Sequence, residues 1–279
     1  MDKIINDFIK KSLEEDIGHG DITSQACISK NAIGSAKMIA KDNCIIAGIN
    51  IAKKIFNYFD KELQFHHFTE DGKEVNIKDV IFEITGKQQA ILATERLVLN
   101  CMQRMSGIAT KTRSFINQVQ DLNTVLLDTR KTCPSIRFLD KEAVRIGGAQ
   151  NHRHGLYDVI MIKDNHIDFS GGISNAIKNC HKHLKKIKKD IKIIIEVRDL
   201  DELNQVLISG GVDRILLDNF SLQRTKLAVD IINGKYEIES SGNINLQTVR
   251  GYALCGVNYI SIGNLTHSIK SIDLSMRSI

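Results

Sequence analysis

The sequence predicts an α/β protein in two parts, a small mixed α/β unit followed by a barrel-like domain built on a parallel sheet. Six short, almost continuously apolar runs in the second half indicate strands that are buried on both faces, as in parallel sheets. Helical patterns separate several of these runs, and such alternation of strand and helix is typical of α/β folds. The 279 residues suit one large domain or two ordinary ones.

The first part begins with a helical pattern in which Ile4, Ile5, Phe8, Ile9 and Leu13 recur at helical spacing. The turn-rich segment DIGHGDITS follows, and residues 34–95 then alternate between β-type runs and one helix. The β-type runs are GSAKMIAK, CIIAGI, LQFHHF, DVIFEITG and QAILAT, and the expected helix is NIAKKIFNYF at residues 50–59. These runs indicate a small mixed α/β unit.

The longest helical stretch runs from about Thr94 to Gln120 and is expected to join the two parts. Gly107 interrupts it and indicates close packing against another segment. The apolar stripe consists of Leu97, Cys101, Met105, Ile108, Phe115 and Val119.

The six apolar runs of the second part are TVLLDT, VIMIKD, KIIIEV, RILLDN, YEIES and NYISIG. Five of them carry a charged residue at or near the C-terminal end, namely Asp128, Lys163, Glu196, Asp218 and Glu239. In a β/α barrel these ends surround the active site. Ordinary strand-end residues are the alternative, but five equivalent positions favour a site.

The composition excludes several classes of protein. No run approaches the roughly 18 apolar residues of a membrane span, and the N-terminus has no signal-peptide pattern. The six cysteines form no C-x-x-C pair, so we expect reduced thiols in a cytoplasmic protein. The basic stretch at residues 181–190 lacks interleaved aromatic residues, so we expect a solvated helix face and no nucleic-acid partner.

Cationic side chains follow the first strands of the second part. Arg130 and Lys131 follow the first run, His152 and Arg153 follow a glycine pair, and Lys163 ends the next run. If these strands form a barrel, the cations converge on one pocket, whose ligand should carry several negative charges. A zinc site at His152 and His154 is the alternative, but the arginine between them would repel a metal ion.

Two carboxylates, Glu196 and Asp218, end consecutive strands. They suit Mg²⁺, which proteins usually hold through few carboxylates together with ligand phosphates. A general acid/base pair and a structural ion pair with local cations are the alternatives.

The segments ESSGNI and SIGNLTHS place small polar residues between a strand and a helical pattern. Backbone N–H groups at such a helix start can hold a phosphate, and the last two strands of barrels often do so. Helix N-capping by Ser241, Asn243 or Thr266 is the alternative. From the residues alone, we expect a sugar-phosphate substrate and a second anion.

A series of segments resembles, in the same order, the motifs of quinolinate phosphoribosyltransferases: ERLVLNCMQRMSGIAT, DTRKTCPSIR, GGAQNHRHGLYD, IKDNHI, EV-x-DLDEL, ILLDN, ESSGNI and SIGNLTHS. The segment DIGHGDIT near the start also resembles that family. The match covers nearly the whole chain, and the combination of motifs is more specific than any single one.

The resemblance implies an N-terminal mixed α/β sandwich domain at residues 1–110 and a C-terminal incomplete α/β (TIM-like) barrel at residues 111–269, with the tail at about 270–279 packing back on the first domain. It implies a decarboxylating pentosyltransferase of NAD biosynthesis. This enzyme would convert quinolinate and phosphoribosyl pyrophosphate, with Mg²⁺, into nicotinate mononucleotide, pyrophosphate and CO₂. It also implies a homodimer or a hexamer of dimers with a shared active site.

The resemblance also implies a role for each site residue. The quinolinate-binding set is Arg96 (reaching in from the partner subunit), Arg130, His152, Arg153 and Lys163. The catalytic set is Lys131 at the pyrophosphate, Lys163 between both ligands, and Glu196 and Asp218 at the ribose hydroxyls and Mg²⁺. The 5-phosphate set is Ser241, Gly242, Gly263 and His267.

The chain departs from the family pattern at Ser135, Ala149, Gln150, Ile194 and Asn264. None of these departures removes a charged pocket residue. A related enzyme that acts on nicotinate or another anionic heteroaromatic compound is the nearest alternative, and a molybdenum-transport-associated relative shares the architecture. A catalytically silent barrel that binds phosphoribosyl metabolites is the alternative from another class.

Overall fold

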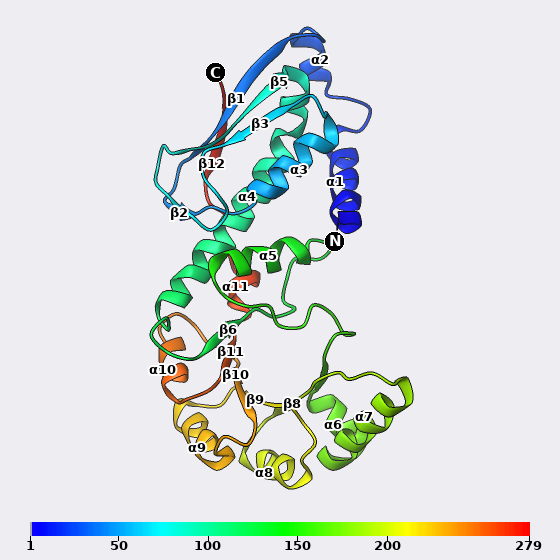
Figure 1. Ribbon diagram of the computed structural model, residues 1–279, viewed down its shortest axis with the longest axis vertical. Coiled ribbons are helices and arrows are strands. Elements are labelled where there is room, and N and C mark those ends of the chain that lie inside the picture. Colours follow the sequence, from blue (N-terminus) through cyan, green and yellow to red (C-terminus); the bar gives the residue numbers. More distant parts are fainter. Residues whose placement is uncertain (1) are drawn as a thin grey trace. The chain divides into compact units, whose positions relative to one another are not determined.

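The computed structural model describes residues 2–279, which divide into two compact units (Figure 1). The first unit runs through Arg113 and also contains Thr132–Gly148 and Thr266–Ile279. The second unit consists of Ser114–Lys131 and Ala149–Leu265. The predicted α/β class, with a barrel-like second part, is confirmed.

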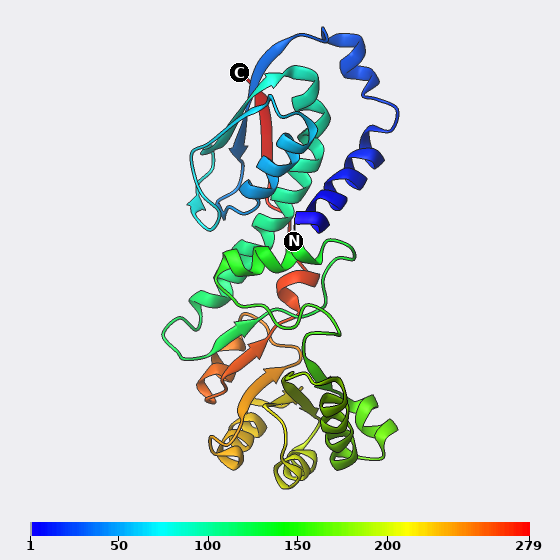
Figure 2. The same ribbon diagram turned by 45° about the vertical axis from the view of Figure 1, so that its right-hand side comes forward.

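The first unit is built on an antiparallel four-stranded sheet of order β12-β1-β5-β3. Its strands are β1 (Ile33–Ala40), β3 (Gln64–His67), β5 (Val80–Lys87) and β12 (Leu274–Ser278). Strand β12 pairs with β1 although more than two hundred residues separate them, and Figure 2 shows the red C-terminal strand beside the blue one. A second, two-stranded sheet pairs β2 (Cys44–Ile45) with β4 (Glu74–Val75).

Apolar side chains of the sheet and the helices form the core of this unit, where Met38, Phe56, Phe82 and Ile84 are almost completely buried. The helices are α1 (Asp2–Ile17), α2 (Ile22–Cys27), α3 (Ile49–Phe59), α4 (Gln88–Asn117, which ends in the second unit), α5 (Arg137–Gly147) and, at the boundary, α11 (Asn264–His267). Helix α3 confirms the helix expected at residues 50–59, and α1 confirms the first helical pattern. The turn-rich segment, in contrast, contains the start of α2, which Asp21 caps by accepting a hydrogen bond from Ser24 N at 3.0 Å.

The prediction of a β-type run at QAILAT is wrong, because α4 already begins at Gln88. The hydroxyl of Thr94 donates to the carbonyl of Ala90 at 2.8 Å, a contact that fits a helical turn. Ala90 and Ile91 are buried, so the run is apolar because it faces a core. A short apolar run is compatible with either a buried strand or a buried helix.

The long helix itself is confirmed, and the five stripe residues within it are buried; Val119 is also buried but lies beyond the end of α4 at Asn117. A β-carbon at Gly107 would lie 2.3 Å from the carbonyl oxygen of Lys270. The close packing predicted at this glycine is therefore real, and the segment before β12 lies directly against α4.

The second unit contains one parallel six-stranded sheet of order β6-β11-β10-β9-β8-β7. All six predicted runs form its strands: β6 (Val125–Leu127), β7 (Ile160–Ile162), β8 (Ile193–Val197), β9 (Arg214–Asp218), β10 (Glu237–Ser241) and β11 (Tyr259–Ser261). Within the described chain, β6 and β7 stand at the two ends of this order and do not pair, so the barrel is open there. Gln150 continues the sheet at β6 through an isolated parallel bridge to Leu127.

Helices α6 (Asp164–Ser170), α7 (Ile173–Ile187), α8 (Leu200–Ser209), α9 (Leu222–Ile232) and α10 (Val249–Leu254) connect these strands. The helical patterns between the apolar runs, in ISNAIKNCHKHLKKI, LDELNQVLISGG and LQTVRGYALCG, form α7, α8 and α10, whereas no helical pattern predicted α6 and α9. None of the helices within residues 2–279 is long and apolar enough to cross a membrane.

Candidate active site

The register of the parallel sheet determines which strand-end residues share a face. Glu196 lies beside Leu216, and Leu216 lies beside Glu239. Asp218 lies beside Ser241. Because alternate residues of a strand point to the same face, Glu196, Asp218 and Ser241 share one face of the sheet.

Two further predicted residues continue the same face at the carboxyl ends of their strands. Lys163 follows Met161 by two positions, and Met161 lies beside Ile194. Gly263 follows Ser261 by two positions, and Tyr259 lies beside Glu239. The other face carries fully buried apolar residues such as Ile195, Ile215 and Leu217. Five of the predicted site residues therefore meet at one edge of the barrel.

Lys163 and Glu196 form a hydrogen-bonded ion pair at this edge. Burial raises the pKa of Glu196, the ammonium group of Lys163 acts in the opposite direction, and the charge of Asp218 raises the pKa further. The pKa of Glu196 consequently lies above its ordinary value. Asp218 therefore lies close enough for its charge to act on Glu196.

The charge of one arginine of the second unit acts on another. Burial lowers the pKa of Arg153, and the charge of Arg130 lowers it further, while Glu196 acts in the opposite direction. Arg130 and Lys131 are exposed in the segment that follows β6. Arg130 and Glu196 thus lie close enough to Arg153 for their charges to act on it, and an anionic ligand would relieve the repulsion between the two arginines.

Two buried carboxylates bind the segment that carries His152. Asp128 accepts hydrogen bonds from Asn151 Nδ2 and from the backbone N–H of His152, each at 2.8 Å. The imidazole of His152 is only 6% exposed, and its Nε2 lies 3.3 Å from Oε2 of Glu239, whose side chain is fully buried. His152 therefore points into the barrel rather than toward solvent.

A tight turn follows β10 at the positions predicted to hold a phosphate. Gly242 has a φ of 97°, and a β-carbon there would lie 2.3 Å from Oδ1 of Asn219. Asn219 N–H donates to the carbonyl of Ser241 at 2.9 Å, and Asn243 Nδ2 donates to Asn219 Oδ1 at 3.1 Å. This close approach of two strand-end loops requires glycine at this position.

The remaining two predicted residues, Arg96 and His267, belong to the first unit. Arg96 is exposed on α4, beside the buried Leu97. His267 is exposed at the end of α11, and its Nδ1 lies 2.6 Å from the hydroxyl of Ser268. Their roles at a substrate stay predictions.

No group of three or more His, Cys, Asp or Glu side chains that could hold a metal ion occurs within the described residues. Two nearby carboxylates still fit Mg²⁺ if ligand phosphates and waters complete its shell. The Mg²⁺ site at Glu196 and Asp218 therefore stays a prediction.

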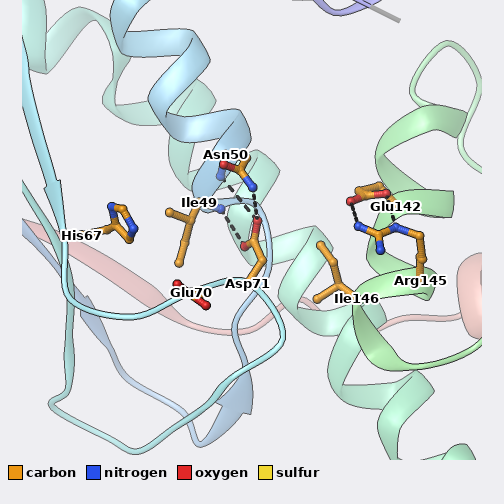
Figure 3. Close-up of a pocket in the computed structure, with 8 residues that line it drawn as sticks. All are labelled: Ile49, Asn50, His67, Glu70, Asp71, Glu142, Arg145 and Ile146. Carbon is orange, nitrogen blue, oxygen red and sulfur yellow. Dashed lines mark hydrogen bonds and ion pairs between the residues drawn. The ribbon is translucent and has the colours of Figure 1, made fainter.

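A separate pocket of about 470 Å³ lies within the first unit (Figure 3). Asp71 accepts a hydrogen bond from Ile49 N at 2.9 Å, and Glu142 pairs with Arg145 at 2.6 Å. The residues that line it are Ile49, Asn50, His67, Glu70, Asp71, Glu142, Arg145 and Ile146, and none is a predicted site residue.

A network of charged side chains in the strands of the site was not predicted from the sequence. Arg214 Nη1 lies 3.0 Å from Glu239 Oε2, and Arg214 Nη2 lies 3.2 Å from Glu237 Oε2. The guanidinium also stacks 3.5 Å from the ring centroid of Tyr259, whose hydroxyl donates to Glu237 at 3.0 Å. The sequence feature that could have indicated this network is the presence of charged residues at alternate positions of an apolar strand, as at Glu237 and Glu239.

This fold and site define a class of protein, an open α/β barrel whose strand ends combine cations, paired carboxylates and a tight glycine turn. Comparison with known families is consistent with this class. Residues 21–106 match the model of the quinolinate phosphoribosyl transferase N-terminal domain, and residues 108–277 match that of the C-terminal domain. The chain belongs to the quinolinate phosphoribosyl transferase family.

Individual relatives are similar over nearly the whole chain. A chloroplastic nicotinate-nucleotide pyrophosphorylase [carboxylating] of Arabidopsis thaliana is 41% identical, over 96% of this chain and 81% of the relative. A probable nicotinate-nucleotide pyrophosphorylase [carboxylating] of Bacillus subtilis is 40% identical, over 99% of this chain and 92% of the relative. The solved nicotinate-nucleotide pyrophosphorylase from Francisella tularensis is 39% identical, with a TM-score of 0.92 over 100% of this chain and 97% of that one.

Two of the departures from the family pattern have a visible structural setting. Ser135 has a φ of 65°, in the left-handed region that favours glycine. Gln150 takes part in the sheet through its backbone, because its N–H donates to Leu126 at 2.9 Å and its carbonyl accepts from Asp128 at 3.1 Å. These contacts do not depend on the side chain of Gln150.

Proposed function

We propose that the protein is a quinolinate phosphoribosyltransferase, which forms nicotinate mononucleotide, pyrophosphate and CO₂ from quinolinate and phosphoribosyl pyrophosphate. Family membership supports this proposal. The observation that carries it is the shared sheet face at the strand ends, which gathers Lys163, Glu196, Asp218, Ser241 and Gly263. A reaction between a phosphorylated sugar and a dianion needs this combination of charges at one edge.

Quinolinate carries two carboxylates on neighbouring ring carbons, so its binding site must offset two negative charges. Arg130 and Arg153 supply planar guanidinium groups that match carboxylates bidentately, and Lys163 supplies a third cation. The lowered pKa of Arg153, caused by burial and then by Arg130, is consistent with a cationic site built to receive an anion. Arg96 supplies a further cation from the partner subunit.

The ribose, in contrast to quinolinate, needs negatively charged groups nearby. When the bond from C1 to pyrophosphate breaks, positive charge develops on the ribose, and Glu196 and Asp218 stabilise it. Lys131 stabilises the leaving pyrophosphate, and the turn at Ser241 and Gly242, with Gly263 and His267, holds the 5-phosphate. Glu196 and Asp218 are the residues that would hold Mg²⁺, and the ion would supply Lewis-acid stabilisation of the same leaving group.

The structure of quinolinate determines the order in which bonds form and break in the proposed reaction. The lone pair of the pyridine nitrogen forms the bond to C1 of the ribose, and the ring becomes cationic. The bond from ring carbon 2 to its carboxylate then breaks, CO₂ leaves, and the electron pair remains on a carbon beside the positive nitrogen. This carbon takes up one proton. Decarboxylation therefore needs the ring nitrogen to be substituted first.

The assembly and location belong to the same proposal. A homodimer, or a hexamer of dimers, would bring Arg96 of one chain to the pocket of its neighbour, and the exposure of Arg96 on α4 supports this arrangement. A cytoplasmic location is supported by the six free cysteines.

Melting temperatures test substrate choice without catalysis. Any ligand that binds only the native state raises the melting temperature. We expect quinolinate alone to raise it in a concentration-dependent way, and nicotinate, which has one carboxylate fewer, to raise it much less at the same concentration. A larger shift with nicotinate would favour the related enzyme that acts on nicotinate.

A further inference from the structure

The hydrogen bonds around His152 define the protonation of its ring. Nδ1 accepts a hydrogen bond from the backbone N–H of Arg153 at 2.7 Å, so Nδ1 carries no proton in this arrangement. The proton of a neutral ring is then on Nε2, which lies 3.3 Å from Oε2 of Glu239 and donates to it. Protonation of Nδ1 would place two N–H groups against each other at hydrogen-bonding distance.

Glu239 can hold this ring because it is itself fixed. Its side chain is fully buried in the middle of β10, and Arg214 Nη1 donates to the same oxygen, Oε2, at 3.0 Å. A buried carboxylate is retained in a fold only where such partners offset the cost of removing its charge from water. Glu239 thus connects the segment that contains His152 and Arg153 to the barrel interior.

The backbone on either side of His152 is fixed as well. Asp128, also fully buried, accepts hydrogen bonds from Asn151 and from the N–H of His152. Rotation of the imidazole would break its bonds to both Arg153 and Glu239. The position of the Arg153 backbone is therefore coupled to the carboxylate of Glu239 through a single imidazole.

We propose that Glu239 is a positioning residue for substrate binding: its buried carboxylate accepts a hydrogen bond from Nε2–H of His152, the N–H of Arg153 keeps Nδ1 unprotonated, and the imidazole held in this way orients Arg153. This inference rests on the proposed function for the identity of the ligand, quinolinate. With both ring nitrogens engaged, His152 adds no positive charge to the pocket and has no free nitrogen with which to protonate the product. Lys163, whose side chain is 40% exposed, is the cation of this site that could supply the proton instead.

The first test is spectroscopic and uses the unmodified protein. Protein labelled with ¹⁵N only at histidine, with the His152 signals assigned from a His152→Gln variant, reports which ring nitrogen carries the proton. We expect His152 at neutral pH to show an unprotonated Nδ1 and a protonated Nε2. A doubly protonated ring, or a proton on Nδ1 alone, would overturn the proposal whatever reaction the protein catalyses.

The second test compares two glutamates that share Arg214. Glu239→Gln removes the charge that holds His152, while Glu237→Gln removes a carboxylate that contacts Arg214 and Tyr259 only. We expect Glu239→Gln to raise the dissociation constant of quinolinate about tenfold, which is the cost of one weakened charged hydrogen bond. Glu237→Gln should leave that constant within about twofold of the wild-type value.

Glu239→Asp keeps the charge with a shorter reach and should give an intermediate dissociation constant, which separates positioning from loss of folding. Equal constants for the wild type and Glu239→Gln would refute the positioning role. If the wild-type protein itself fails to bind quinolinate, the proposed function fails, while the tautomer measurement still decides the state of His152.

Discussion

At the scale of single residues, the candidate site brings together cations that repel one another. A bound anion would reduce this repulsion. The pKa of Arg153 is lowered first by burial and then by the charge of Arg130. Keeping two guanidinium groups together in this way costs free energy in the unliganded protein. Binding of a dianion would recover it, so we expect a substrate with two carboxylates to suit this site better than a substrate with one.

Replacement of Arg153 by alanine should raise the dissociation constant of quinolinate by about tenfold or more, because a bidentate, charged hydrogen bond is lost. Isothermal titration calorimetry measures this constant directly. Arg198→Ala is a suitable control, since Arg198 forms its ion pairs with Glu202 and Asp168 on other elements. An unchanged constant in Arg153→Ala would remove Arg153 from the quinolinate site.

The cysteines should differ in reactivity according to their burial. Burial raises the pKa of Cys44 to about 11 and that of Cys101 to about 12, whereas Cys27 and Cys133 are exposed. Because only the thiolate reacts, iodoacetamide at pH 8 should modify Cys27 and Cys133 in the native protein and spare Cys44 and Cys101.

Mass spectrometry of peptides from the treated protein identifies the modified thiols, and treatment in urea should modify all six. Native modification of Cys101 at the rate of Cys27 would show that the core around α4 opens far more readily than its burial indicates.

Sequence reasoning at this scale found the cations and carboxylates at strand ends but not the network that supports them. The positions of Lys163, Glu196 and Asp218 followed from charge at the end of an apolar run. The roles of Glu239 and Arg214 did not follow, because their partners come from other strands and from a loop. Only the three-dimensional register brings Arg214 beside Glu237 and within reach of Glu239.

At the scale of elements, apolar pattern was a reliable guide to the strands of the second unit. Each of the six predicted runs forms a strand because parallel strands are buried on both faces and so read as continuous apolar segments. The same logic failed at QAILAT, where the apolar side chains belong to the start of α4. Helices α6 and α9 follow strands closely, and no helix was predicted in either segment.

Gly107 gives an element-scale prediction. Alanine is the better helix former by about 1 kcal/mol, so Gly107→Ala in an isolated helix would be stabilising. Here the added methyl group meets the backbone carbonyl of Lys270 at 2.3 Å, so we expect the substitution to lower the free energy of unfolding by about 1–3 kcal/mol.

Urea denaturation followed by circular dichroism measures the effect. Asn100→Ala, at an exposed position of the same helix, reports helix propensity alone and should be neutral or stabilising. A stability gain in Gly107→Ala would mean that the segment before β12 does not lie against α4 as described.

At the scale of the whole molecule, the chain combines an antiparallel sheet, whose edge strand β12 comes from the C-terminus, with an open parallel barrel. Both halves were recognisable from sequence pattern. The gap between β6 and β7 was not deducible from pattern, because strand runs do not reveal which neighbours pair; it was expected only from the resemblance to a family with an incomplete barrel. The sequence pattern does not reveal the oligomeric state either, because whether a second copy of the chain buries a surface depends on the surfaces of both copies.

A shared active site can be tested by mixing inactive subunits. Arg96→Ala removes the cation that we expect to act in the neighbouring pocket, and we expect Lys131→Ala to disable the pocket of its own chain. A mixture of the two variants should recover part of the wild-type activity, because some mixed dimers contain one pocket with both residues. Subunit exchange must be shown independently with tagged chains; no recovery after proven exchange would contradict a shared site.

The central claim is that this protein couples ribosylation of quinolinate to loss of its 2-carboxylate. The most direct measurement follows release of CO₂ from quinolinate labelled at that carboxylate, with nicotinate present in a parallel reaction as a competing substrate. We predict release that requires both phosphoribosyl pyrophosphate and Mg²⁺, with nicotinate mononucleotide as the product. The absence of release, together with turnover of nicotinate, would contradict the claim.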